Sequence, residues 1–133
     1  MELEKKDLKK LHGMYQDMCN EVYAYEALVE TLKEKTYQET LKKIISERKN
    51  HLKILSKLTQ EELSAKDDDE KYLKRLIRIF GEKRMFKHLS GIMEERAKES
   101  RKLSEKVPEL KIIATAESKY QASFLRLSKL EKA

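Results

Sequence analysis

Tryptophan is absent from this sequence, and cysteine, proline and glycine are scarce, with one, one and three residues respectively. The single cysteine, Cys19, excludes an intramolecular disulfide and is typical of a reducing compartment, so we expect a cytoplasmic protein. So little glycine and proline leaves few residues for the many turns of a sheet-rich protein. These scarcities favour long helices and an all-α fold.

Long apolar runs are also missing. No stretch approaches the roughly 20 residues needed to cross a bilayer, so we expect no membrane partner. Charged residues make up 41% of the sequence, with a net charge of +6. Lysine and glutamate alternate through most of the chain, which is typical of solvated helix faces rather than of a binding patch. Only residues 71–84 are locally basic.

Apolar residues recur at helical spacing through the first half of the chain. The first predicted helix covers about residues 2–35, and Leu8 belongs to its apolar stripe. Thr36–Glu39 forms a capping box, which predicts the start of a second helix. A further capping box at residues 59–62 indicates that this helix restarts as a short one. The polar segment Ala65–Asp69 then divides the chain.

The second half shows the same spacing. A helical segment over residues 70–80 is interrupted at Gly81 and resumes as far as Val107. Pro108 ends that helix and suits the first turn of the next one, which we expect over residues 109–130.

Four main helices with short turns within each half predict an antiparallel four-helix bundle with an interrupted third helix, because short turns make sequential helices antiparallel neighbours. The length fits a single domain over residues 1–133, with helix pairs at about 2–64 and 70–131.

Several polar residues interrupt the apolar stripes. Arg48 and His51 lie three apart on one helix, Glu117 and Tyr120 lie three apart on another, and Glu21 is in the middle of the first stripe. Burying an unpaired charge costs several kcal/mol, so these residues must satisfy one another or a ligand. The alternative is that both glutamates lie at the edge of the core with their carboxylates in water.

In these residues the chain resembles the ferritin-like superfamily, in particular rubrerythrin-type domains and the ferritin-like domain attached to some iron transporters. The resemblance covers nearly all of the chain and is carried by Glu21–Ala24, Arg48–Leu55, Leu103 with Val107–Leu110, and Glu117–Tyr120. It implies a ferritin-like bundle whose core holds two metal ions between carboxylate and histidine ligands.

Half of the implied ligands are missing. Glu21, His51 and Glu117 match ligand positions of the family. Three lost-ligand positions hold Arg48, Met93 and Tyr120 instead, and Ser100 stands where the family often has tyrosine. In this register Glu94 points away from the core. Arg48 brings a fixed positive charge to the place of the metal charge. We therefore expect a buried polar network, consisting of Glu21, Arg48, His51, Glu117 and Tyr120.

Three functional hypotheses follow. The favoured one is a ferritin-like bundle without diiron chemistry or cofactor, which we do not expect to be an enzyme, with a structural, binding or regulatory role as a homodimer. The second is a metalloprotein that keeps one iron or manganese ion on Glu21, His51 and Glu117; the resemblance then implies oxidase, peroxidase or metal-sensing activity. The last is nucleic-acid binding through the basic residues Lys71, Lys74, Arg75, Arg78, Lys83 and Arg84, although no recognition motif accompanies them.

Overall fold

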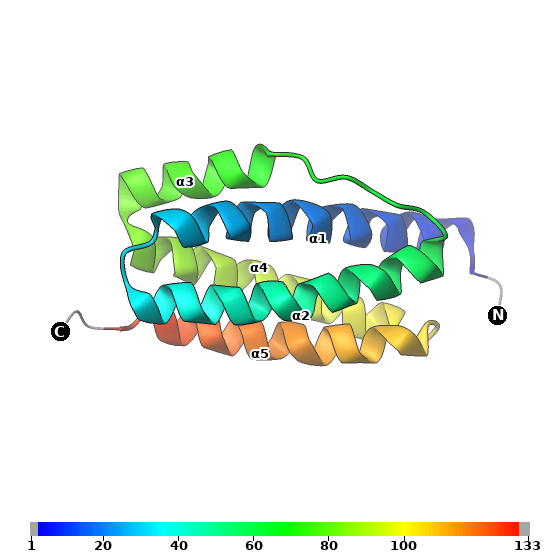
Figure 1. Cartoon of the computed structure of the whole chain (residues 1–133). Helices are drawn as coiled ribbons and strands as arrows, with labels where there is room; N and C mark the ends of the chain where they lie inside the picture. Colours follow the sequence, from blue (N-terminus) through cyan, green and yellow to red (C-terminus); the bar gives the residue numbers. More distant parts are fainter. Residues whose placement is uncertain (1–2, 131–133) are drawn as a thin grey trace. The chain divides into compact units, whose positions relative to one another are not determined.

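The structure is a computed structural model that describes residues 3–130. Within this range all regular structure is helical, which confirms the all-α prediction (Figure 1). The elements are α1 (Lys5–Thr31), α2 (Lys35–Thr59), α3 (Asp68–Phe80), α4 (Glu82–Leu103), the 3₁₀ helix η1 (Pro108–Leu110) and α5 (Lys111–Leu127). The predicted helix ends at residues 2 and 131 lie outside the described residues.

The chain divides into two compact units, one up to Lys74 and one from Arg75. In the first unit α1 and α2 pack side by side and run antiparallel, because only residues 32–34 connect them (Figure 1). Their apolar stripes are buried: Leu28 in α1 and Leu41 in α2 have no exposed surface. This helical hairpin carries Glu21, Arg48 and His51.

The second unit is built on α4 and α5, which also pack against each other. Phe86 in α4 stacks on Phe124 in α5 with ring centroids 5.9 Å apart. Pro108 begins η1, as expected for a residue whose missing N–H is not needed in a first turn. The preceding helix ends at Leu103 rather than at Val107, because residues 104–106 form a turn.

The capping box predicted at Thr36–Glu39 is wrong. α2 begins one residue earlier, at Lys35, so Thr36 lies inside the helix. The residue before the helix, Glu34, makes no side-chain capping hydrogen bond. Instead Gln38 Nε2 donates to the carbonyl of Leu32 at 2.5 Å and holds the turn between the two helices.

The helix predicted to restart at residues 59–62 is also wrong. α2 ends at Thr59, whose hydroxyl donates back to the carbonyl of Leu55 at 2.8 Å. Gln60 follows in the left-handed conformation, with φ of 57°, and this reverses the chain. Residues 61–67 are then not helical, so α2 does not reach residue 64.

Residues 61–66, here called the strap, are held on α1 by hydrogen bonds. Tyr15 Oη donates to the carbonyl of Glu61 at 3.2 Å and accepts from the amide of Leu63 at 3.3 Å. Gln16 Nε2 donates to the carbonyl of Ser64 at 2.9 Å, and Asn20 Oδ1 accepts from the amide of Lys66 at 2.7 Å. The α1 side chains thereby satisfy backbone groups that a helix would have paired internally.

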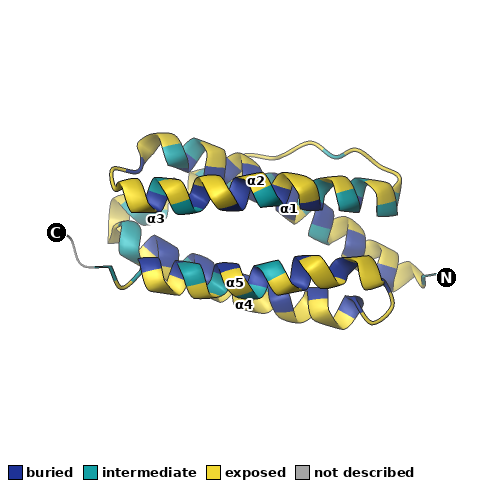
Figure 2. Cartoon of the chain, turned by 60° about the horizontal axis from the view of Figure 1, so that its bottom comes forward, coloured by how far each residue is buried: buried dark blue, intermediate teal, exposed yellow. Residues whose placement is uncertain are grey.

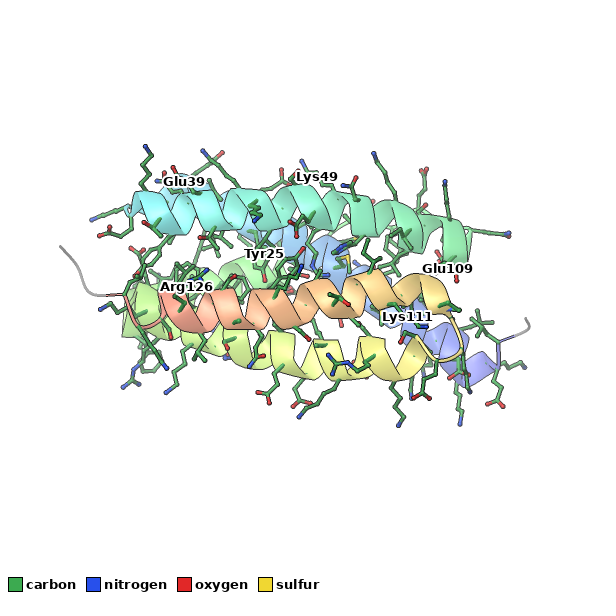
Figure 3. All side chains as sticks on the ribbon, turned by 90° about the horizontal axis from the view of Figure 1, so that it is seen from below. Tyr25, Glu39, Lys49, Glu109, Lys111 and Arg126 are labelled. Atoms are coloured by element: carbon green, nitrogen blue, oxygen red, sulfur yellow. The ribbon has the colours of Figure 1, made fainter. Side chains whose placement is uncertain are left out.

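Burial recurs along the helices with helical spacing, and Figure 2 shows buried and exposed residues alternating along each of them. In the predicted stripe of α1, the position of Leu8 is wrong: Leu8 is 46% exposed, and the adjacent Asp7 is buried. Charged side chains occupy the solvent-facing positions, among them Glu39 and Lys49 of α2, which are labelled in Figure 3.

Two glycines should respond oppositely to alanine substitution. Gly81 precedes α4 with φ of +91°, a conformation that costs other residues about 1–3 kcal/mol, so Gly81→Ala should lower the free energy of unfolding by that amount. Gly13 lies inside α1 and is exposed, with nothing near its would-be Cβ. Gly13→Ala should therefore raise the free energy by up to about 1 kcal/mol. Urea denaturation checks both, and an unchanged Gly81→Ala variant would contradict the first.

Candidate functional site

The buried polar residues of the first unit come from the centres of its two helices. Glu21 replaces an apolar residue on the stripe of α1 and is 3% exposed. Arg48 and His51 lie one turn apart on the stripe of α2 and are 0% and 4% exposed. Packing of the two stripes brings the three side chains together, so the predicted burial of all three is confirmed.

Arg48 makes directed contacts with both neighbours. Its Nε donates to Glu21 Oε2 at 3.3 Å, and its Nη2 lies 3.1 Å from Glu21 Oε1. A guanidinium offers two parallel donors that match the two oxygens of a carboxylate, so this ion pair is bidentate. The third nitrogen, Nη1, lies 3.2 Å from Nδ1 of His51. Both members of the ion pair are buried, so each charge is compensated by the other in a place where water does not reach it.

The contact with Arg48 also defines the state of His51. A guanidinium can only donate, so Nδ1 of His51 accepts and its proton is carried on Nε2. Burial disfavours the charged imidazolium, and the charge of Arg48 disfavours it further. Together they lower the pKa of His51 from 6.5 to about 4, although Glu21 and Glu47 act in the opposite direction. His51 is therefore neutral at pH 7.

The second unit contains a smaller polar pair between α4 and α5. Ser100 Oγ donates to Glu117 Oε1 at 2.5 Å, and the two residues are 0% and 1% exposed. Tyr120 is buried one turn after Glu117, and Met93 is fully buried in α4. A hydroxyl donor to a buried carboxylate partly replaces the hydrogen bonds that water would make to it.

Some contacts of the predicted network are present in the structure, and the others stay predictions. Glu21, Arg48 and His51 are in mutual contact through Arg48. Glu117 is paired with Ser100. A contact between Arg48 and Glu117 stays a prediction. The alternative that the two glutamates extend to water is wrong, because both are buried.

The helix register deduced from the sequence holds in α4. Met93 is fully buried and Glu94 is exposed, as predicted from the apolar stripe through Leu89 and Leu103. Sequence reasoning missed the role of Ser100 as the donor to Glu117. Its signal was available, because Ser100 is a small polar residue on the apolar stripe through Leu89 and Leu103.

Cys19 was also considered as a reactive thiol. Its Sγ lies 3.7 Å from the carbonyl of Leu63 in the strap, and burial raises the pKa of the thiol. A buried thiol with a raised pKa is a poor nucleophile. Cys19 therefore has a structural role, as a buried residue in contact with the strap.

Within residues 3–130 no group of three or more His, Cys, Asp or Glu side chains could hold a metal ion. Every helix in the same range is too short or too polar to pass through a bilayer. Comparison of the chain with family models, curated proteins and solved structures gave no match.

Removing the guanidinium should strongly destabilise the protein. Arg48→Ala leaves the Glu21 carboxylate buried without its partner, which should lower the free energy of unfolding by about 3–5 kcal/mol. Lys49→Ala is the matched control, because Lys49 is exposed and its 3.6 Å pair with Glu26 is on the surface; its effect should stay within about 0.5 kcal/mol. Urea denaturation measures both, and equal midpoints for Arg48→Ala and wild type would disprove the role of this pair.

His51 should make stability depend on pH. Between about pH 6.5 and pH 4 the unfolded chain binds a proton at His51 that the folded protein does not, so stability should fall as the pH drops through this window. The loss attributable to His51 should reach about 3 kcal/mol near pH 4. His51→Gln keeps a hydrogen-bond acceptor for Arg48 and cannot titrate. Parallel pH profiles of unfolding free energy for wild type and His51→Gln would refute the lowered pKa.

Proposed function

We propose that this chain is a ferritin-like four-helix bundle that does not perform diiron chemistry and that serves a structural or binding role as a homodimer. The observation that carries the proposal is the position of Arg48. Its buried guanidinium engages both oxygens of Glu21 and Nδ1 of His51. Glu21 and His51 are the two residues of the first unit that match ligand positions in the family resemblance.

The donor set of the first unit does not fit a diiron centre. Two dications need several carboxylates both for binding and for bridging. Here the buried carboxylate of Glu21 already neutralises a cation, since a guanidinium does not lose its proton at accessible pH. A metal ion would have to take the Glu21 carboxylate away from Arg48. The guanidinium would then stay buried beside the positive charge of the metal. No redox step through a metal is therefore part of the proposal.

The ferritin-like arrangement is supported by the order of the elements and by the register of their polar residues. The helices come in two hairpins, α1 with α2 and α4 with α5. α3 and α4 are separated only by Gly81, as expected for an interrupted third helix. Glu21, Arg48, Met93 and Glu117 are all buried at positions where the family resemblance places ligands.

Two other functions receive less support. A single metal ion on Glu21, His51 and Glu117 requires carboxylate and imidazole atoms that already have partners, Arg48 for the first two and Ser100 for the third. Nucleic-acid binding would use the basic residues between positions 71 and 84, which lie in α3 and in the first turn of α4. Two of these, Lys71 and Lys74, lie 3.2 Å from Asp67 and 2.8 Å from Glu70, so acidic residues offset part of the positive charge.

The proposal is tested by metal content. Protein produced in medium supplemented with iron and manganese should contain less than about 0.1 metal ion per chain, and added metal should leave its melting temperature unchanged. The variant Arg48→Glu, Met93→Glu, Tyr120→His supplies the missing ligand types at all three lost-ligand positions. It should bind about two metal ions per chain and melt at a higher temperature when they are present.

The matched control makes the same residue types at exposed neighbours on the same helices, as Lys49→Glu, Lys98→Glu, Lys119→His. It should remain metal-free. A wild-type protein that holds about one equivalent of iron or manganese, and that melts higher with it, would contradict the proposal and establish the metalloprotein alternative.

A further inference from the structure

The solvent-facing side of α2 carries a row of lysines. Residues 42–57 hold six Lys and Arg residues and one acidic residue, and so do residues 71–84. The prediction that only the second segment is locally basic is therefore wrong. Successive residues of a helix turn by about 100°, which places six exposed polar side chains of the first segment on the side of α2 away from its buried residues. They are called the lysine stripe and comprise Lys42, Ser46, Lys49, Asn50, Lys53 and Lys57.

The positive charge of the lysine stripe is poorly compensated. Glu47, the acidic residue of this segment, lies on the flank of α2 outside the stripe. Lys49, labelled in Figure 3, lies 3.6 Å from Glu26 of α1. Within residues 3–130 the other three lysines of the stripe form no salt bridge: Lys42, Lys53 and Lys57.

The spacing of these lysines differs from that of lysines on other helices. In α4, Lys98 has an acidic residue one turn away, Glu94, at 3.8 Å. In the stripe Lys49, Lys53 and Lys57 follow one another at intervals of one turn, so each has a like charge beside it. Like charges at this spacing repel each other and lower helix stability. An anion bound along the stripe would remove this repulsion.

We propose that the lysine stripe of α2 binds the phosphate backbone of duplex DNA without reading its sequence. The stripe is about 22 Å long from Lys42 to Lys57. Duplex DNA carries one negative charge per about 1.7 Å of its axis, so it presents phosphates along the whole stripe. Lysines meet phosphates as point charges, and the exposed Ser46 and Asn50 add hydrogen-bond donors of the kinds that contact phosphate. Such contacts position a protein on the duplex and carry no sequence information.

Other anionic partners would need side chains that the stripe lacks. All of α2 is described by the structure, and it exposes no large apolar or aromatic residue. A helix that lies on a membrane inserts an apolar face, but the apolar face of α2 is buried. Single-stranded nucleic acid is held by aromatic side chains that stack on its bases, and a protein partner by apolar or aromatic anchors.

The form of the duplex is selected by the shape of α2. The major groove of B-form DNA is about 12 Å wide and admits an α-helix, whereas that of A-form RNA is deep and narrow. A stripe along one straight helix therefore fits DNA better than duplex RNA.

This inference goes beyond the proposed bundle, because it depends neither on the ion pair of Arg48 nor on the homodimer. The stripe is on the other side of α2 from Arg48, which is buried. Failure of DNA binding would leave the proposed metal-free bundle intact, and metal content tests that proposal separately.

The experiment is fluorescence anisotropy of a labelled random duplex of about 20 base pairs, titrated with protein at about 50 to 200 mM salt. The wild type should bind the duplex at about 50 mM salt. The logarithm of its association constant should fall with the logarithm of the salt concentration at a slope of about −3.6, since each of four lysines contributes about 0.9.

The test variant Lys53→Gln, Lys57→Gln removes two of the four charges. Its slope should shrink to about −1.8, and its affinity at about 50 mM salt should fall at least about tenfold. Only exposed side chains change, so circular dichroism should show the helix content of the wild type. A loss of affinity then reports binding rather than folding.

The matched control Lys6→Gln, Lys98→Gln removes the same net charge from exposed lysines that have acidic partners, Glu4 and Glu94, each at 3.8 Å. Its slope and affinity should equal those of the wild type. An equal loss in the control would overturn the proposal, because net charge alone would then explain binding.

Further outcomes would also overturn the proposal. These are the absence of binding at about 50 mM salt and an unchanged slope in the Lys53→Gln, Lys57→Gln variant. Loss of binding in Arg75→Gln, Arg78→Gln, with the stripe intact, would assign the DNA contact to residues 71–84 instead. Tighter binding to single-stranded DNA, duplex RNA or phosphatidylserine vesicles than to duplex DNA would identify another anionic partner and refute the assignment.

Discussion

The compensation of one buried guanidinium by one buried carboxylate is the constraint on which the first helical hairpin depends. Arg48 and Glu21 are both removed from water, so breaking their ion pair would leave two buried charges with less compensation. Their pairing favours one register of α2 against α1, because shifting α2 by one residue would turn Arg48 about 100° away from Glu21. The neutral state of His51 follows from the same charge, since its Nδ1 accepts from Arg48.

The spacing of apolar residues predicted most of the helices, because residues three and four positions apart must share the helix face that is buried. The polar residues Glu21, Arg48 and Glu117 were expected inside because they interrupt apolar stripes, and each is buried. The register that buries Met93 and exposes Glu94 followed from the same spacing. The sequence could also indicate that Arg48 needs an acidic partner, because a buried cation without one is costly.

Helix ends were predicted poorly for a physical reason. Capping motifs such as Thr36–Glu39 are common in sequences rich in Thr and Glu, and they compete with other ways of pairing the terminal amides and carbonyls. Here Gln38 reaches back to the carbonyl of Leu32, and Gln60 turns the chain at the end of α2. Ser100 was overlooked as a partner because a hydroxyl carries no charge, although its position on the apolar stripe of α4 indicated burial.

The strap changes the character of the first hairpin. A helical hairpin is normally closed at one end only, and its free ends fray first. Here residues 32–34 close one end, and the strap returns to Tyr15, Gln16 and Asn20 near the other, across 46 to 48 residues of chain. α1 is therefore connected to α2 at both ends of their contact, by residues 32–34 at one end and by the strap at the other. Local unfolding at the strap end requires several side-chain-to-backbone hydrogen bonds to break together. This end should therefore unfold cooperatively rather than one residue at a time.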